Sequence, residues 1–248
     1  MAIAHSNLLL DALPAEDAAR ITPLLRSIPL KTRTRLHEEG QPIETVYFPN
    51  GGVCSLTVTM EDGRVAEVGL AGREGAVGYM AGFGQQFAAH DAMVQIPDGS
   101  AQFLSTRDFR EEMGRGGALH ALVTRYMVAA NSLTAMSVAC NALHTAEERC
   151  ARWLLHAHDR VGSDRFELSH EFLAMMLGVR RPTATIVAGI LQRAGYIRYR
   201  RANMEILDRR GLEDASCECY RAIETHFIGV LPPARPIEAG DPIRSEAR

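Results

Sequence analysis

The chain has 248 residues, 46% of them apolar, which suits one large or two ordinary globular domains. Its formal net charge of −3 excludes a polycation that binds nucleic acid through overall charge, so any such binding must come from a local cluster. No run of 18 apolar residues is present, the N-terminus lacks a basic segment, and the five cysteines form an odd, dispersed set. We therefore expect a reduced, cytoplasmic protein without a membrane partner.

Residues 7–26 space their apolar side chains as helices do, with breaks at Asp11 and Pro14, and predict two short helices. The pattern then changes to short β-rich runs at 46–48, 53–60, 65–70, 93–96 and 101–104. The turn residues at 61–64 and 97–99 predict hairpins between their flanking runs. Such repeated short strands predict a barrel or a β-roll (jelly roll) domain, which we place at residues 1–116.

Residues 117–142 predict one long helix with few charges. Such a helix needs burial on more than one face, so we expect one face to cover the β domain and another to pair with a second copy in a homodimer. A core helix within one monomer is the alternative. The predicted dimer interface consists of Leu119, Leu122, Tyr126, Ala130, Leu133 and Met136.

The next segment, residues 143–220, predicts a winged helix-turn-helix. Thr145 and Glu148 have capping-box spacing and open a helix, and Ser169 is a good N-cap for a second helix over 170–177. Gly178 permits a tight turn into a third helix, which has a proline in its first turn and ends at Gly195. We expect this third helix to face inward through Ile186, Ile190 and Leu191.

Residues 196–201 and 204–207 alternate as two strands, with a turn at Ala202-Asn203. This hairpin is the predicted wing. Six arginines and no acidic residue lie between positions 178 and 201, a local charge of +6 that indicates a phosphate-facing surface. We expect residues 221–248, which contain four prolines, to form a disordered tail.

The candidate DNA-binding residues divide by expected role. The N-terminal end of the third helix is expected to enter the major groove, with Arg181 bonding guanine O6 and N7. The residues expected in the major groove are Arg180, Arg181, Thr183 and Thr185. The residues expected to bind phosphates are Ser169, His170, Arg198, Arg200 and Arg201.

The run LSHEFLAMMLGVRRPTATIVAGILQRAGYI is similar to the DNA-binding signature of the Crp-Fnr family of bacterial transcription regulators. The order β-roll, long helix, helix-turn-helix and wing also resembles this family over roughly residues 7–220. The resemblance implies a homodimer that binds palindromic double-stranded DNA, with RNA polymerase as a further partner. It matches Ser169 and His170 to backbone contacts and Arg181 to a base-reading arginine. Pro182 and Ile186 depart from the family's other two base readers.

The resemblance also implies a cyclic-nucleotide-binding-like domain with a glycine-rich turn, a glutamate for the ribose and an arginine for the cyclic phosphate. The candidate effector-binding residues are Gly72, Arg73, Glu74, Gly75 and His90. Ala76 aligns with the glutamate and His90 with the arginine, so neither usual contact is retained. We therefore expect that neither cyclic AMP nor cyclic GMP is the effector, and that the protein works constitutively or responds to another small molecule or a redox change.

No cofactor, metal site or catalytic residue is predicted. Cys217 and Cys219 are too close in sequence for the usual C-x2-C zinc spacing, although a haem ligand among His37, His90 or His120 stays open. Two other functions remain alternatives: a cyclic-nucleotide-responsive regulator or adaptor, and a cupin-like metal enzyme, which would need clustered His and Glu in the barrel.

Overall fold

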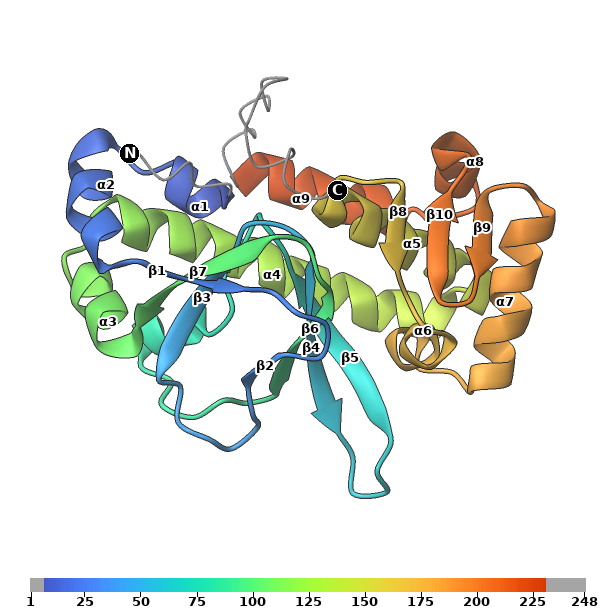
Figure 1. The fold of residues 1–248 in the computed structure, drawn as a ribbon, viewed down its shortest axis with the longest axis horizontal. Helices are drawn as coiled ribbons and strands as arrows, with labels where there is room; N and C mark the ends of the chain where they lie inside the picture. Colours follow the sequence, from blue (N-terminus) through green and yellow to red (C-terminus); the bar gives the residue numbers. More distant parts are fainter. Residues whose placement is uncertain (1–6, 231–248) are drawn as a thin grey trace.

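In the computed structural model, residues 7–230 are described and form mixed helices and strands (Figure 1). The first part of the chain contains α1 (Leu8–Asp11), α2 (Ala15–Ile21), η1 (Thr22–Leu24), β1 (Arg26–Pro29), β2 (Arg35–His37), β3 (Thr45–Pro49), β4 (Val53–Thr59), β5 (Val65–Ala71), η2 (Tyr79–Phe83), β6 (Asp91–Ile96), β7 (Ser100–Ser105) and α3 (Thr106–Gly114). The second part contains α4 (Ala118–Leu143), α5 (Ala146–Val161), β8 (Arg165–Glu167), α6 (His170–Leu177), α7 (Arg181–Arg193), β9 (Ile197–Arg200), β10 (Asn203–Ile206), α8 (Arg209–Asp214) and α9 (Cys219–Val230).

The N-terminal strands form two antiparallel sheets, in the orders β2-β6-β4-β5 and β1-β7-β3. The predicted β4–β5 hairpin is confirmed, with Gly63 at positive φ in its turn. The second predicted hairpin is wrong, because β6 and β7 belong to different sheets. The chain changes sheets after Ile96, and Gly52 lies so close to the Ile96 carbonyl that a Cβ there would come within 2.4 Å of it.

Helix α4 connects the β-rich part of the molecule to the C-terminal helices (Figure 1). Its first half packs Leu119, Val123 and Tyr126 into a core with Phe48 and Phe109. The two parts of the chain also share contacts: Trp153 on α5 donates its indole N–H to Glu67 on β5 (3.0 Å), and α6 packs on the same sheet. Within residues 7–230, no helix combines the length and hydrophobicity needed to cross a membrane.

The C-terminal helices α5, α6 and α7 and the three-stranded sheet β8-β10-β9 share one core, which also includes Val53, Leu70 and Ile96 of the β-roll. The capping box at Thr145 and Glu148 is present, as the sequence predicted.

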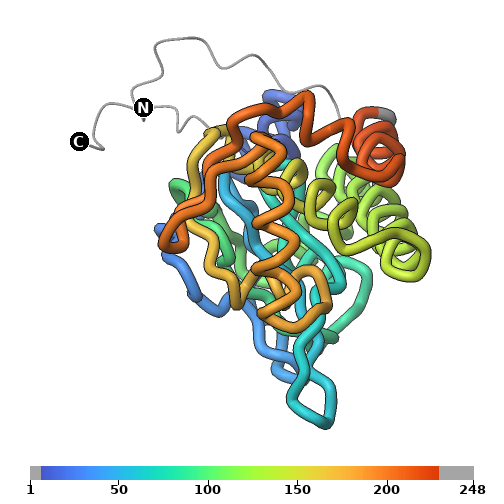
Figure 2. The backbone as a smooth tube through the Cα atoms, turned by 90° about the vertical axis from the view of Figure 1, so that its right-hand side faces the viewer, coloured from blue at the N-terminus to red at the C-terminus, as the bar shows by residue number. Residues whose placement is uncertain are grey.

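The C-terminal helix α9 corrects the prediction of a disordered tail from residue 221. Residues up to Val230 are helical, and α9 runs beside α4 (Figure 2). Ile223 and Phe227 are buried in the same cluster as residues of α4. The prolines that suggested disorder begin only at position 232, and residues 231–248 lie outside the described residues.

Candidate nucleic-acid interface and ligand cavity

Helices α6 and α7 form a helix-turn-helix whose local signals act as the sequence predicted. The Ser169 hydroxyl accepts the Phe172 backbone N–H (3.1 Å), and Gly178 ends α6 at φ 61°. No side chain of the described residues caps the N-terminus of α7. Its first backbone N–H groups, together with the helix dipole, are therefore suited to an anion such as a phosphate.

One face of α7 is solvent-exposed along its first two turns. It carries all four residues predicted for the major groove, Arg180, Arg181, Thr183 and Thr185. The prediction that Ile186 faces inward is wrong, since its side chain is 61% exposed. Leu191 is buried as predicted, and Ile190 is partly buried. Ala184 and Val187 fill the core in place of Ile186, which faces the same side as Thr183 and Thr185.

His170 joins three elements of the candidate interface. Its Nδ1 lies 3.1 Å from the Thr185 hydroxyl of α7, and its ring lies 4.3 Å from the Tyr199 ring of β9. The Thr185 hydroxyl also lies 3.1 Å from the Arg181 carbonyl, to which it can donate when His170 carries its proton on Nδ1. Partial burial and the nearby charge of Arg181 lower the pKa of His170, which favours the neutral ring near pH 7.

The wing hairpin differs from the prediction in its turn and in its charge. The turn residues are Arg201 (φ 51°) and Ala202 (φ 65°), one position earlier than predicted, as a two-residue type I′ turn requires. Arg198 bonds Glu205 (2.7 Å), which also binds Arg165 from β8. Part of the predicted +6 charge is therefore offset by a carboxylate that follows in the next strand.

Arg200 and Arg201 keep their charge available to a ligand. Both are exposed, and neither has an ion-pair partner among residues 7–230. The two arginines, with Arg180 and Arg181 of α7, give the helix-turn-helix and wing four guanidinium groups that no carboxylate of the described chain pairs.

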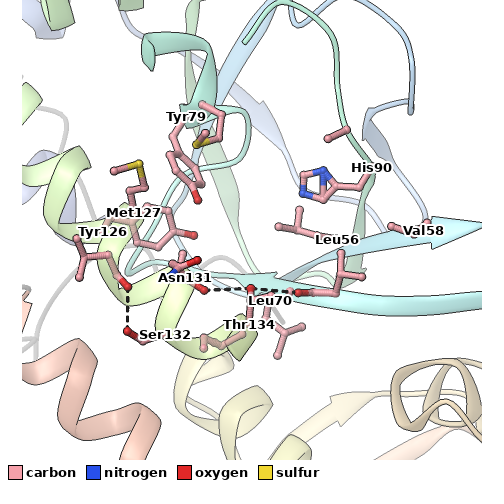
Figure 3. Close-up of a pocket in the computed structure, with 17 residues that line it drawn as sticks. Leu56, Val58, Leu70, Tyr79, His90, Tyr126, Met127, Asn131, Ser132 and Thr134 are labelled. Atoms are coloured by element: carbon pink, nitrogen blue, oxygen red, sulfur yellow. Dashed lines mark hydrogen bonds between the residues drawn. The ribbon is translucent and has the colours of Figure 1, made fainter. Parts of the chain in front are cut away.

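A cavity of about 660 Å³ lies between the β-roll and α4 (Figure 3). One wall is formed by β4 and β5 and the other by residues 126–134 of α4, with η2 and His90 completing it. Its polar groups include Tyr79, Asn131 and Ser132. No Lys, Arg, Asp or Glu is among the described residues that line it, so a neutral ligand suits this cavity better than an anion.

Four of the five residues predicted to bind an effector do not line this cavity. Only His90 lines the cavity, where burial lowers the pKa of its ring. Glu74 instead accepts a hydrogen bond from the Arg160 guanidinium of α5 (2.8 Å) in a buried ion pair. A Cβ on Gly72 would meet the Arg160 side chain, and one on Gly75 would meet Tyr126.

The glycine-rich turn therefore serves packing between the β-roll, α4 and α5. Leu8 of α1 also donates its backbone N–H to the Arg73 carbonyl (2.7 Å). The sequence pattern of glycines could not distinguish this role from ligand binding, because close packing and anion binding both require a backbone without a Cβ.

The side chains predicted for the dimer interface face the core of their own chain. Leu119, Leu122, Tyr126 and Leu133 are buried, and Ala130 and Met136 pack against the same cluster. They contact the β-roll, α1 and α9, which together cover this face of α4. The opposite face is solvent-exposed and carries Ala121, Arg125, Val128, Ala135, Val138 and Ala142.

Three of the cysteines that are dispersed in the sequence lie close together in space. Cys140, His144, Cys217 and Cys219 come together where the C-terminal end of α4 meets the start of α9. No spacing rule found this group, because its two halves are separated by the whole helix-turn-helix.

Residues 148–215 match the model of the Crp-like helix-turn-helix domain. This segment is similar to Crp-like helix-turn-helix domains. It covers α5 to α8, including the wing, and so contains every residue of the candidate DNA interface.

The whole fold resembles solved Crp/Fnr-type transcription regulators. FixK2 from Bradyrhizobium japonicum is 17% identical with a TM-score of 0.60, over 78% of this chain and 98% of that one. TTHB099, a CRP-family transcriptional regulator from Thermus thermophilus, is 21% identical with a TM-score of 0.63, over 77% and 96%. CLP from Xanthomonas campestris, described as a c-di-GMP responsive global regulator, is 18% identical with a TM-score of 0.60, over 78% and 99%.

These likenesses confirm the predicted architecture of a β-roll, a long helix and a Crp-like helix-turn-helix. A comparison with curated proteins gave no match.

Proposed function

We propose that the protein is a cytoplasmic, homodimeric transcription regulator that binds specific DNA sequences and performs no catalysis. The observation that supports this most directly is the exposed N-terminal end of α7 beside a wing whose Arg200 and Arg201 are exposed. A recognition helix enters the major groove by this end, and wing cations hold the phosphate backbone.

Within this interface, Arg181 is the proposed guanine reader. Its fork of donors matches guanine O6 and N7, and the side chain is exposed at the first residue of α7. Pro182 and Ile186 lie on the same exposed surface but cannot hydrogen-bond a base edge. Ile186 instead suits an apolar contact with a thymine methyl group, so we propose an operator that differs from the usual family sequence.

We propose that the dimer forms through the exposed face of α4. Val138 is 67% exposed there, and the small side chains of Ala121, Ala135 and Ala142 allow close approach of a second helix. A two-fold axis along this face would pair α4 with itself and place two recognition helices on a palindromic site.

We propose that the effector binds in the cavity between the β-roll and α4, and that it is not cyclic AMP. A buried cyclic phosphate keeps its charge and needs a cationic partner, whereas His90 is held neutral by burial. A ligand there would contact both β5 and α4, so its binding can shift the helix that positions the DNA-binding domain.

The alternative of a cupin-like metal enzyme has less support. His37 uses its Nε2 to contact the Thr45 carbonyl (2.8 Å), and its ring covers Gly78, which leaves it poorly placed as a ligand.

Selection of bound sequences from a random DNA pool tests the main proposal. We expect a palindromic consensus, and we expect Arg181→Ala to weaken binding to it by about 1–3 kcal/mol and to relax one base pair per half-site. Failure to enrich any sequence, with equal binding by the wild type and the Arg181 variant, would contradict sequence-specific regulation. Calorimetry with cyclic AMP and cyclic GMP tests the effector separately, and micromolar affinity would refute its exclusion.

A further inference from the structure

Four metal-ligating side chains meet at one point outside the DNA interface and the cavity. The ligand atoms of Cys140, His144, Cys217 and Cys219 all lie within 4.8 Å of one another. All three thiols are buried, with exposed fractions of 0%, 4% and 2% in chain order. Met136 is the neighbouring apolar side chain that packs against them.

Local structure explains how the four are brought together. Cys140 and His144 are separated by one helical turn at the C-terminal end of α4, so they face the same side. Cys217 and Cys219 stand at the start of α9, which runs along α4. The turn before α9 lets both thiols point toward Cys140, although only one residue separates them in sequence.

We propose that these four residues bind one zinc ion through three thiolates and His144 Nδ1. Ideal tetrahedral zinc, with bonds of about 2.3 Å to sulfur and 2.0–2.1 Å to nitrogen, separates ligands by roughly 3.8 Å for S···S and 3.6 Å for S···N. The distance from Cys219 Sγ to His144 Nδ1 is 3.6 Å, and that from Cys140 Sγ to Cys217 Sγ is 3.4 Å. A Cys₃His set that is almost closed to solvent is a common structural zinc site.

The groups around the four ligands fit the same assignment. The other nitrogen of His144, Nε2, lies 3.2 Å from the Glu218 carboxylate. An Nε2–H donated to this carboxylate would fix the tautomer that leaves Nδ1 free for the metal, as carboxylates commonly do for zinc-binding histidines.

A nearby cation offsets part of the negative charge of the site. Three thiolates and one Zn²⁺ carry a net charge of −1, and the buried Arg152 acts electrostatically on Cys140. The Nε of Arg152 has no hydrogen-bond partner among the described residues, so its charge is not fully used elsewhere. Zinc binding would release the three thiol protons to solvent, which leaves the site balanced without an oxidant or reductant.

A disulfide is a weaker assignment for the same cysteines. The Cys140 and Cys217 sulfurs are 3.4 Å apart, whereas a disulfide bond is about 2.05 Å long. It would use two of the four converging side chains and leave Cys219 and the oriented imidazole of His144 without a function.

The position of the ion assigns it a mechanical role. His144 directly follows α4 and precedes Thr145, the N-cap of α5, so it lies in the hinge that leads to the DNA-binding domain. Bound zinc would hold the start of α9 against this hinge. Loss of the metal would release α9 from α4 and loosen the link between the long helix and the DNA-binding domain.

Metal analysis of the full-length protein, purified under reducing conditions with zinc supplied, tests the proposal. We expect one zinc per chain in the wild type and in Cys150→Ala, which removes a buried cysteine outside the group. We expect loss of at least nine tenths of this zinc in Cys219→Ala and a large loss in His144→Ala. Zinc retained at the wild-type level by both ligand variants would overturn the assignment.

Cobalt titration of the reduced, zinc-free wild type avoids the risk that a variant fails to fold. We expect one equivalent to give the visible and thiolate charge-transfer absorption of tetrahedral cobalt, and zinc to displace it. Absence of these bands would overturn the proposal, as would a Cys140–Cys217 disulfide in a reduced-prepared protein that takes up no metal. A chelator should also lower the Tm of the zinc-loaded wild type and leave that of Cys219→Ala unchanged.

Discussion

Two side chains on α4 allow the dimer interface to be tested against the core of the monomer. Val138 is 67% exposed, whereas Leu133, five residues earlier on the same helix, is 4% exposed. We expect Val138→Asp to abolish the dimer and leave the fold of each chain intact. We expect Leu133→Ala to destabilise the fold of each chain without a specific effect on association.

The size of both effects follows from burial. Burying a whole valine side chain stabilises by about 1.5–3 kcal/mol, so burying the exposed 67% contributes roughly 1–2 kcal/mol per chain. The dimer contains this residue twice, so it loses roughly 2–4 kcal/mol, an increase of about 30- to 850-fold in the dissociation constant. The aspartate adds the cost of burying an unpaired carboxylate. Leu133→Ala should lower the free energy of unfolding by about 2–5 kcal/mol.

Analytical ultracentrifugation over a concentration series measures the dissociation constant, and chemical denaturation measures folding. Phe87→Asp is the matched control, because Phe87 is 55% exposed and lies between η2 and β6, outside α4. An unchanged dissociation constant for Val138→Asp would refute the assigned face. A wild-type monomer that binds a single half-site would refute the dimer itself.

Three further predictions concern DNA binding and stability. Arg200→Ala should remove one phosphate contact per chain and reduce the slope of log K against log salt concentration by about 1.8 per dimer. Arg198 is paired with Glu205, so Arg198→Ala should change this slope less. Equal slopes for the two variants would contradict the different roles of the two arginines. A phosphate beside His170 would raise the lowered pKa of this residue, so the ring would gain a proton when DNA binds. DNA affinity, measured by fluorescence anisotropy, should then rise as pH falls toward about 6 in the wild type but not in His170→Gln. Glu74→Ala should lower the free energy of unfolding by about 3–5 kcal/mol, since it leaves the buried Arg160 without its carboxylate; a Tm equal to that of the wild type would show that Glu74 is free for another role.

The local architecture of the DNA-binding domain was determined by the sequence itself. Ser169 as an N-cap, Gly178 in the left-handed region and a proline in the first turn of α7 act within a few residues of their own position. Such signals depend on backbone geometry that neighbours in the chain decide, so they survive in any tertiary context. The family resemblance rests on the same segment, which is why the fold could be predicted.

Contacts between distant segments were decided only by the tertiary structure. The low charge of α4 predicts burial on more than one side, but it does not show which side meets its own chain, because that depends on where the β-roll and α9 pack. The strand β7 pairs in a different sheet from β6, and this pairing also depends on contacts with strands far away in the sequence.

The roles of the candidate site residues were also decided by contacts between distant segments. The sequence made Glu74 a candidate effector-binding residue, but in the structure it pairs with Arg160 of α5, which is 86 residues away in the sequence. Cys140 and Cys217 are 77 residues apart and meet only because α9 folds back along α4. A sequence determines which side chains are able to bind a proton, a metal or a phosphate. Their partners are determined by packing, since hydrogen bonds and metal ligation act over a few ångströms of space whatever the separation along the chain.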